Sequence, residues 1–211
     1  MFNFNAQKEI EKKEKKMQRF LREQKFDAVL LTKQNNFAWF TAGGDNHVVI
    51  ATDGGVASIL ITKDKKYIIT NNIESERIMD EEVKGQGFEI KSYNWWEDDE
   101  KLKIIRGIVK SGNIVSDDGS FGFKNIDNEL APLRYILTNE EIKKYKWGGK
   151  NAGKAMAKVC KKIKKGDTEN KVASSFAKEL LKDGIIPHVL LIAADERISK
   201  ELAESIKYYA S

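Results

Sequence analysis

The residues best placed to do chemistry form one short polar run, Asp45, Asn46 and His47. An imidazole beside a carboxylate and an amide can both donate and accept hydrogen bonds. If this run forms an exposed tip, it can contact the charged or polar end of a small ligand. The alternative is a plain helix-to-strand turn with a polar tip, which needs no ligand.

The residues before this run predict how it is held. Phe37 and Trp39 are expected to anchor a short helix in the core, and Gly43 and Gly44 allow a turn with positive φ. The apolar run 48–52 that follows is typical of a strand.

Histidine and cysteine are scarce in this chain. Besides His47 the chain has one histidine, His188, which follows Pro187 and opens an apolar run, so a structural role is expected. The single cysteine, Cys160, excludes an intrachain disulfide and is predicted to be a structural thiol in a lysine-rich helix. We therefore predict no catalytic and no metal-binding residue in this chain.

Composition narrows the class of protein. The 211 residues are 41% hydrophobic and 33% charged, with a net charge of +5. No window is apolar enough for a membrane span, and the N-terminus lacks the apolar stretch of a signal peptide, so a cytoplasmic protein is predicted. Residues 140–182 carry 13 basic and 5 acidic residues. These lysines recur at helical spacing without interleaved aromatics, which favours a solvated helix face over nucleic-acid binding.

The first part of the chain has the pattern of a mixed α/β domain, assigned to residues 1–130. Helices are predicted over 6–25, 72–85 and 98–112, with Ile73, Ile78 and Val83 facing inward in the second of these. Strands are predicted over 27–32, 48–52, 57–62, 66–70, 88–96 and in the segment 113–119. We expect a mixed sheet of five or six strands flanked by helices.

Two tryptophans close the strand predicted over 88–96. A tryptophan pair at a strand end can form a binding surface, but packing of Trp95 and Trp96 is the favoured prediction. Asp98 or Asp99 is expected to cap the helix that follows.

The second part, residues 131–211, is helical at first. Thr138 and Glu141 form a capping box, Gly166 ends the first helix, and Asp167 or Thr168 caps a second helix that Asp183-Gly184 stops. A buried strand over 188–194 and a short closing helix over 199–211 are predicted. The positions expected to face a core in the first helix are Ile142, Tyr145, Ala152, Ala155, Met156, Val159 and Ile163.

These motifs resemble, in order and spacing, the creatinase/aminopeptidase P/prolidase-type family, the M24 "pita-bread" metallopeptidases. The first part is similar to the creatinase-type N-terminal domain in its "DAVLLT", "NFAWFTAG" and "VIATDG" runs. The second part, "LTNEEIKKYKWGGKNAGKAMAKVCKKIKKGDTEN", resembles the start of the catalytic domain. The resemblance covers roughly residues 7 to 200 and implies an incomplete pita-bread α/β segment after the N-terminal domain.

The resemblance also shows what is missing. The family uses two divalent metals, such as manganese, held by two Asp, one His and two Glu that follow the segment seen here. Asp183-Gly184 and Asp195-Glu196-Arg197 faintly echo such ligand strands, but Asp183-Gly184 lies where a helix must stop. We therefore expect a chain inactive by itself, either a piece of a longer Xaa-Pro aminopeptidase- or prolidase-like protein or a short paralogue.

By resemblance, the N-terminal domain packs against a partner subunit and lends residues to its active-site mouth. Asp45, Asn46 and His47 would then touch a peptide substrate's terminus. The alternative function is a non-catalytic protein-binding or dimerisation module. A homodimer is expected through the inner stripe of the second part, which comprises Met156, Val159, Ile163, Val172, Phe176, Leu180 and Leu181. The predicted tail helix, with Leu202, Ile206 and Tyr209, would cover part of that stripe.

Overall fold

A computed structural model describes residues 6–97 and 99–200. The chain divides into two compact units, residues 1–141 and 142–211. The boundary between them falls inside a long helix, later than the boundary at residue 130 that the sequence pattern suggested. None of the described helices is long and apolar enough to cross a membrane.

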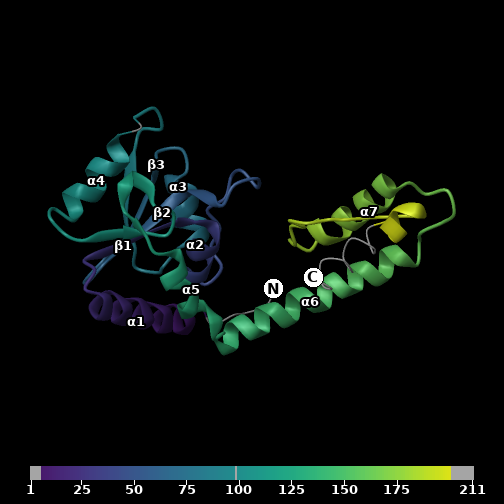
Figure 1. The fold of residues 1–211 in the computed structure, drawn as a ribbon, viewed down its shortest axis with the longest axis horizontal. Coiled ribbons are helices and arrows are strands. Elements are labelled where there is room, and N and C mark those ends of the chain that lie inside the picture. The colour runs from purple at the N-terminus through teal and green to yellow at the C-terminus, as the bar shows by residue number, and fades with distance from the viewer. Residues whose placement is uncertain (1–5, 98, 201–211) are drawn as a thin grey trace. The chain divides into compact units, whose positions relative to one another are not determined.

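The first unit is built on one six-stranded sheet with the strand order β4-β3-β2-β1-β5-β6 (Figure 1). The central strand β1 pairs antiparallel with β2 and parallel with β5, so the sheet is mixed as predicted. The hairpin of β2 and β3 is antiparallel, and β4 and β6 extend the sheet by parallel pairing. The strands are β1 (Ala28–Lys33), β2 (Gly54–Thr62), β3 (Lys66–Asn71), β4 (Glu89–Tyr93), β5 (Ile114–Ser116) and β6 (Lys124–Asn125).

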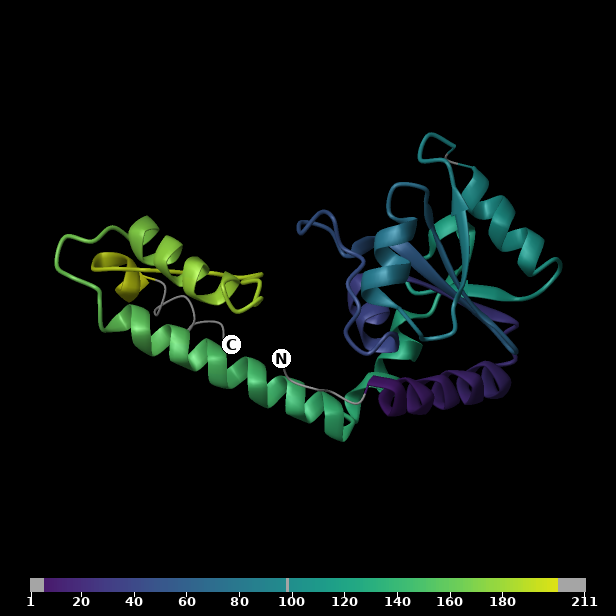
Figure 2. The ribbon, with the colours of Figure 1, turned by 180° about the vertical axis from the view of Figure 1, so that it is seen from behind.

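Helices cover both faces of this sheet, because successive strand residues point to opposite faces. On one face Val29 and Leu31 pack in a cluster with side chains of α1, α2 and α5. On the other face Ala28 and Leu30 pack with Ile105. This residue belongs to α4, the helix on the opposite side of the sheet from α2 (Figures 1 and 2). The helical elements of this unit are α1 (Ala6–Gln24), α2 (Gln34–Phe40), α3 (Ser75–Arg77), the π-helical turn η1 (Ile78–Glu82), α4 (Glu100–Ile108), the 3-10 turn η2 (Ser120–Gly122) and α5 (Asp127–Tyr135).

A buried ion pair fixes α1 beneath this unit. The Lys13 ammonium lies 2.5 Å from Glu9 and 2.8 Å from Glu141, and it donates to the carbonyl of Trp39 at 2.6 Å. Glu9 lies one turn before Lys13 on α1, Trp39 belongs to α2, and Glu141 lies in the helix that begins at Asn139. One buried cation therefore ties three helices together. Its neighbours satisfy its donors, as a buried charge requires.

The helices of the second part begin where the sequence predicts, but the first of them ends at Cys160, six residues before the predicted stop at Gly166. The Thr138 backbone N–H donates to Glu141 and the Glu141 N–H donates to the Thr138 hydroxyl, which is the predicted capping box of α6 (Asn139–Cys160). Thr168 accepts from Lys171 N–H and caps α7 (Glu169–Leu181). Gly184, at φ +73°, ends α7 in the left-handed conformation. In the second unit, Ala155 and Val159 pack against Phe176 and Leu180.

Two predicted strands are wrong. Residues 48–52 and 188–194 are not strands. The apolar side chains of the first run are exposed, and in the second run Val189 and Leu191 are exposed while the others are partly buried. A short apolar run predicts a strand only if a neighbouring strand edge is free to pair with it, and among the described residues neither run finds one. The predicted closing helix begins as a helical segment at residue 196, and its part beyond residue 200, with Leu202, Ile206 and Tyr209, lies outside the described residues.

Several side chains predicted to face a core are on the surface instead. Ile78 and Val83 are buried as predicted, but Ile73 is exposed because it precedes the helix. In the second part the wrongly assigned positions are Ile142, Tyr145, Met156, Ile163 and Leu181, all exposed. A helical stripe in the sequence is wider than the contact that one neighbouring helix provides.

Candidate functional site

The polar run predicted to contact a ligand lies in one loop, residues 42–53, which we name the tip loop. It leaves α2 and enters β2. Gly43 has φ +110° and its N–H donates to Ala38 O at 2.7 Å, so the predicted glycine turn is confirmed at this residue. Gly44 has no positive φ; it packs against Thr41, whose hydroxyl accepts from Gly44 N–H at 3.0 Å.

Asn46 is an anchor of the tip loop and not part of an exposed tip. Only 1% of Asn46 is exposed, so its predicted exposure is wrong. Its side-chain amide donates to Ala57 O at 2.7 Å, and its backbone carbonyl accepts from Val56 N–H at 2.9 Å. Gly55 packs against the Asn46 side chain so closely that any Cβ there would overlap it. The buried amide therefore fastens the loop to β2.

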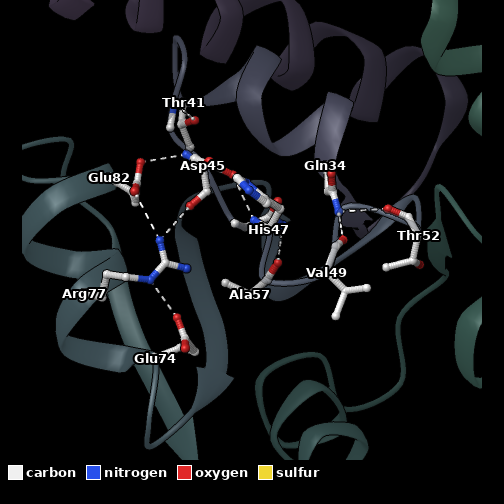
Figure 3. Close-up of polar contacts among 12 residues, drawn as sticks. Gln34, Thr41, Asp45, His47, Val49, Thr52, Ala57, Glu74, Arg77 and Glu82 are labelled. Atoms are coloured by element: carbon white, nitrogen blue, oxygen red, sulfur yellow. Dashed lines mark hydrogen bonds and ion pairs between the residues drawn. The ribbon is translucent and has the colours of Figure 1, made fainter. Parts of the chain in front are cut away.

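His47 and Asp45 form a half-exposed pair (Figure 3). The His47 ring nitrogen Nδ1 faces Asp45 Oδ1, and the same oxygen accepts from His47 N–H at 2.9 Å. Because Nδ1 is engaged, Nε2 is the ring atom left to meet a ligand. With a proton on Nδ1 alone, Nε2 accepts a hydrogen bond, and in the imidazolium form it donates one.

An arginine clamp holds Asp45 from the side of η1. Asp45 N–H donates to Glu82 Oε2 at 2.7 Å, and Arg77 Nη1 donates both to Asp45 O and to Glu82 Oε1, at 3.3 and 3.2 Å. Arg77 Nε is held in turn by Glu74 at 2.7 Å (Figure 3). This network fixes the backbone from which the His47–Asp45 pair projects.

Gln34 holds the far end of the tip loop. Its side-chain amide lies within hydrogen-bonding distance of three backbone carbonyls, Val49 O at 3.2 Å, Thr52 O at 2.8 Å and Gly54 O at 3.2 Å (Figure 3). Its own N–H donates to Asp53 O at 2.8 Å. A side chain bound to several carbonyls stabilises a loop that has no strand partner.

The apex of the tip loop is apolar. Val48, Val49 and Ile50 are 57%, 57% and 55% exposed. Three consecutive β-branched residues on the surface form an apolar patch next to the His47–Asp45 pair. The arrangement suits contact with a partner surface at the apex and with a polar ligand group at His47.

Sequence reasoning found the polar run but missed the residues that hold it. Gln34, Arg77 and Glu82 contact the loop from elements that are distant in the chain, and no local pattern marks such contacts. The pattern of residues 72–85 indicated only a helix with an inward apolar side.

Other candidate residues show no chemistry of their own. Among residues 6–97 and 99–200, no group of three or more His, Cys, Asp or Glu side chains could hold a metal. His188 and Cys160 are both exposed. The His188 side chain is therefore not packed in a core, as a structural role would require. Asp183-Gly184 ends α7, as predicted. Trp95 and Trp96 are exposed, so the favoured prediction that they pack is wrong.

Comparison with known protein families identifies the domain that carries the tip loop. The profile of the creatinase/prolidase N-terminal domain family matches residues 14–136, more than half of the chain. No curated protein sequence is significantly similar to the chain.

Solved structures share the fold. An Xaa-Pro dipeptidase from Bacillus anthracis aligns with a TM-score of 0.61 and 20% identity, covering 82% of this chain and 49% of that one. A prolidase from Pyrococcus horikoshii aligns with a TM-score of 0.63 and 22% identity, covering 82% of this chain and 49% of that one. An X-Pro aminopeptidase from Thermotoga maritima aligns with a TM-score of 0.60 and 19% identity, covering 81% of this chain and 49% of that one. The chain thus spans about half the length of each of these proteins.

Proposed function

The chain belongs to the creatinase/prolidase N-terminal domain family, and from this premise we propose that it forms the docking part of an Xaa-Pro peptidase-like protein. In this proposal the first unit carries the tip loop to a partner subunit, which is a second copy of the same protein. The observation that carries the proposal is an apolar apex, Val48 to Ile50, on a loop fixed by side-chain hydrogen bonds. A rigid exposed apex loses little conformational entropy when it docks.

The proposed role of His47 is to meet the terminus of a peptide substrate. The Nε2 atom of His47 can donate to a peptide carboxylate when the ring carries both protons, while Asp45 holds Nδ1 and orients the ring. Asn46 is buried against Ala57, so its part in substrate binding is indirect, through the position of the loop. Asp45 and Asn46 are positioning residues in this proposal.

We assign no catalytic step to the described residues. The two divalent metals that family resemblance implies need a cluster of carboxylates and a histidine. The described parts of the chain, 6–97 and 99–200, contain no such cluster, so the residues present do not fit that centre. A peptide substrate, the metals and a cytoplasmic location accordingly remain predictions.

An activity assay tests this assignment. The purified chain, supplied with manganese or cobalt, is expected to give no turnover of an Xaa-Pro dipeptide. Hydrolysis that co-purifies with the chain, and that the metal restores after chelation, would contradict the assignment.

A photo-crosslinking experiment tests the docking role. Replacing Val49 with a photoreactive phenylalanine analogue is expected to give a crosslinked dimer, since the apex would lie against a second copy. The same analogue at Ile136, an exposed apolar position outside the loop, is the matched control. A monomeric product from the Val49 position at every micromolar concentration would contradict the docking role.

A second function is a non-catalytic binding or dimerisation module. It is favoured by exposed apolar side chains in the second unit, including Met156, Val189 and Leu191. Both functions require association, and they differ in whether a peptide ligand perturbs His47. Proton NMR of the His47 ring during titration with an Xaa-Pro dipeptide separates them, because the module predicts no shift.

A further inference from the structure

Two exposed tryptophans lie in the turn between β4 and α4, outside the tip loop. Trp95 and Trp96 are 59% and 61% exposed, and their rings meet edge to face with centroids 5.8 Å apart at 88°. Leaving two large aromatic side chains in water forgoes hydrophobic stabilisation. The mutual contact of the rings creates one continuous aromatic surface.

Hydrogen bonds hold this turn in place. Glu97 N–H donates to Asn94 O at 2.9 Å, and the Asn94 amide donates to Glu97 Oε2 at 3.1 Å. Trp95 N–H donates to the side chain of Asn72 at 3.2 Å, while Asn72 N–H donates to Tyr93 O at 2.8 Å. The ends of β3 and β4 are therefore tied together below the rings. The aromatic surface is preorganised, which lowers the cost of binding.

The segment of the chain that carries the two rings is acidic. Residues 72–100 include ten acidic and three basic residues. Among the described residues, no cation lies within ion-pair distance of Glu76, Glu97 or Asp99. Two basic side chains in and next to this segment are engaged by other carboxylates: Arg77 binds Glu74 and Glu82. Lys103 binds Glu100.

We propose that Trp95 and Trp96 form a docking surface for an arginine- or lysine-rich segment of a partner protein. The face of an indole ring attracts a cation, and arginine stacks on it especially well. The carboxylates of Glu97 and Asp99 supply charge complementarity and exclude anionic partners such as nucleic acid. This surface does not depend on the peptidase-related role of the tip loop.

Calorimetric titration of the full chain with octa-arginine tests the proposal. The matched peptide of eight citrullines has almost the same shape without the charge. We expect the chain to bind octa-arginine and not octa-citrulline. The double variant Trp95→Ala/Trp96→Ala should bind octa-arginine about tenfold more weakly, since cation–π contacts with two rings are lost. Tyr135→Ala removes another exposed aromatic side chain and should leave the affinity unchanged.

Several outcomes would overturn the proposal. Equal affinity of the double variant would mean diffuse attraction to acidic side chains elsewhere on the surface, and equal affinity for octa-citrulline would mean apolar contact. If octa-arginine does not bind at all, the surface does not recognise a cationic segment and the proposal is wrong. Self-association of the wild type that the double variant loses would identify a second copy as the occupant. If the double variant does not fold, Glu97→Gln/Asp99→Asn keeps both rings and must still weaken binding severalfold.

Discussion

At the scale of single residues, the tip loop depends on the absence of a side chain at Gly55. Asn46 reaches into β2 at this point, and its amide binds Ala57 O. A Cβ on Gly55 would overlap the Asn46 amide, whereas a Cβ on Gly54 would have only Thr52 Oγ1 nearby, at 3.8 Å. The two adjacent glycines therefore form a matched pair for mutation.

Gly55→Ala is expected to destabilise the protein by about 2 kcal/mol, because it forces Asn46 out of its site and leaves Ala57 O unpaired. Gly54→Ala should change the free energy of unfolding by no more than about 0.5 kcal/mol. Urea midpoints of both variants check this expectation. Equal midpoints for the two variants would show that Asn46 does not hold the loop.

The candidate site could be predicted from the sequence only in part. Asp45 and His47 were found because polar and imidazole side chains next to glycines are visible locally. The burial of Asn46 was missed because it depends on the path of the backbone past Gly55. Trp95 and Trp96 were expected to pack because large aromatic side chains are usually buried. Their exposure follows from the turn that ends β4, which composition does not reveal.

At the scale of elements, the start of α6 joins a helix cap to a buried ion pair. Thr138 and Glu141 bind each other's backbone N–H groups, and the Glu141 carboxylate also pairs with Lys13 of α1. The cap was predicted because it is local in sequence. The partner Lys13 was not, since it lies far away in the chain.

Thr138→Ala is expected to lower the free energy of unfolding by about 1 kcal/mol, since it removes one side of the capping box. The measurement is the urea midpoint at pH 7. Thr168→Ala, at the cap of α7, is the comparison variant and should show a loss of the same order. A midpoint unaltered in Thr138→Ala would mean that α6 begins at another residue.

The ion pair at Glu141 makes stability depend on pH. Partial burial acts to raise the pKa of Glu141, but hydrogen bonds from Lys13 and from Thr138 N–H outweigh it and hold the pKa below the ordinary value. A lowered carboxyl pKa stabilises the folded state above the unfolded value of about 4.3, and the stabilisation is lost as pH falls through the folded pKa.

Glu141→Gln keeps the capping geometry and removes the charge. Its deficit in stability relative to wild type is therefore expected to be full at pH 7 and to shrink below about pH 4. Urea denaturation of both proteins at pH 7 and pH 3 measures the difference. A deficit that stays constant between the two pH values would show that the charge of Glu141 contributes nothing.

The helices and the paired strands could be predicted because caps, glycine stops and alternating runs are local patterns. The tip loop and the segment 188–194 could not, because an apolar run becomes a strand only beside a partner edge. In the tip loop, Gln34 binds the carbonyls that a neighbouring strand would have bound. The backbone is thus satisfied without a sheet, and its apolar side chains stay on the surface.

At the scale of the whole molecule, the two units differ in how much apolar surface they bury. Each face of the first unit's sheet is covered, as the two clusters around β1 show. In the second unit the cluster between α6 and α7 has four buried members, Ala155, Val159, Phe176 and Leu180. The predicted stripe is therefore split, because Phe176 is buried while Met156 and Leu181 are exposed.

This split decides how self-association through the second unit should be tested. Phe176→Asp would place a charge inside the cluster and unfold the unit, whereas Met156 and Leu181 lie on its surface. Burial of one such side chain at an interface is worth roughly 1.5–3 kcal/mol, enough to shift a dimer equilibrium by tenfold or more.

Sedimentation equilibrium of the wild type is expected to show a dimer, and Met156→Asp should weaken it at least about tenfold. Lys154→Gln, which lowers the net charge by the same one unit at an exposed position of α6, controls for charge alone. A wild type that stays monomeric across micromolar concentrations, or a dimer that both variants weaken equally, would rule out this surface as the interface.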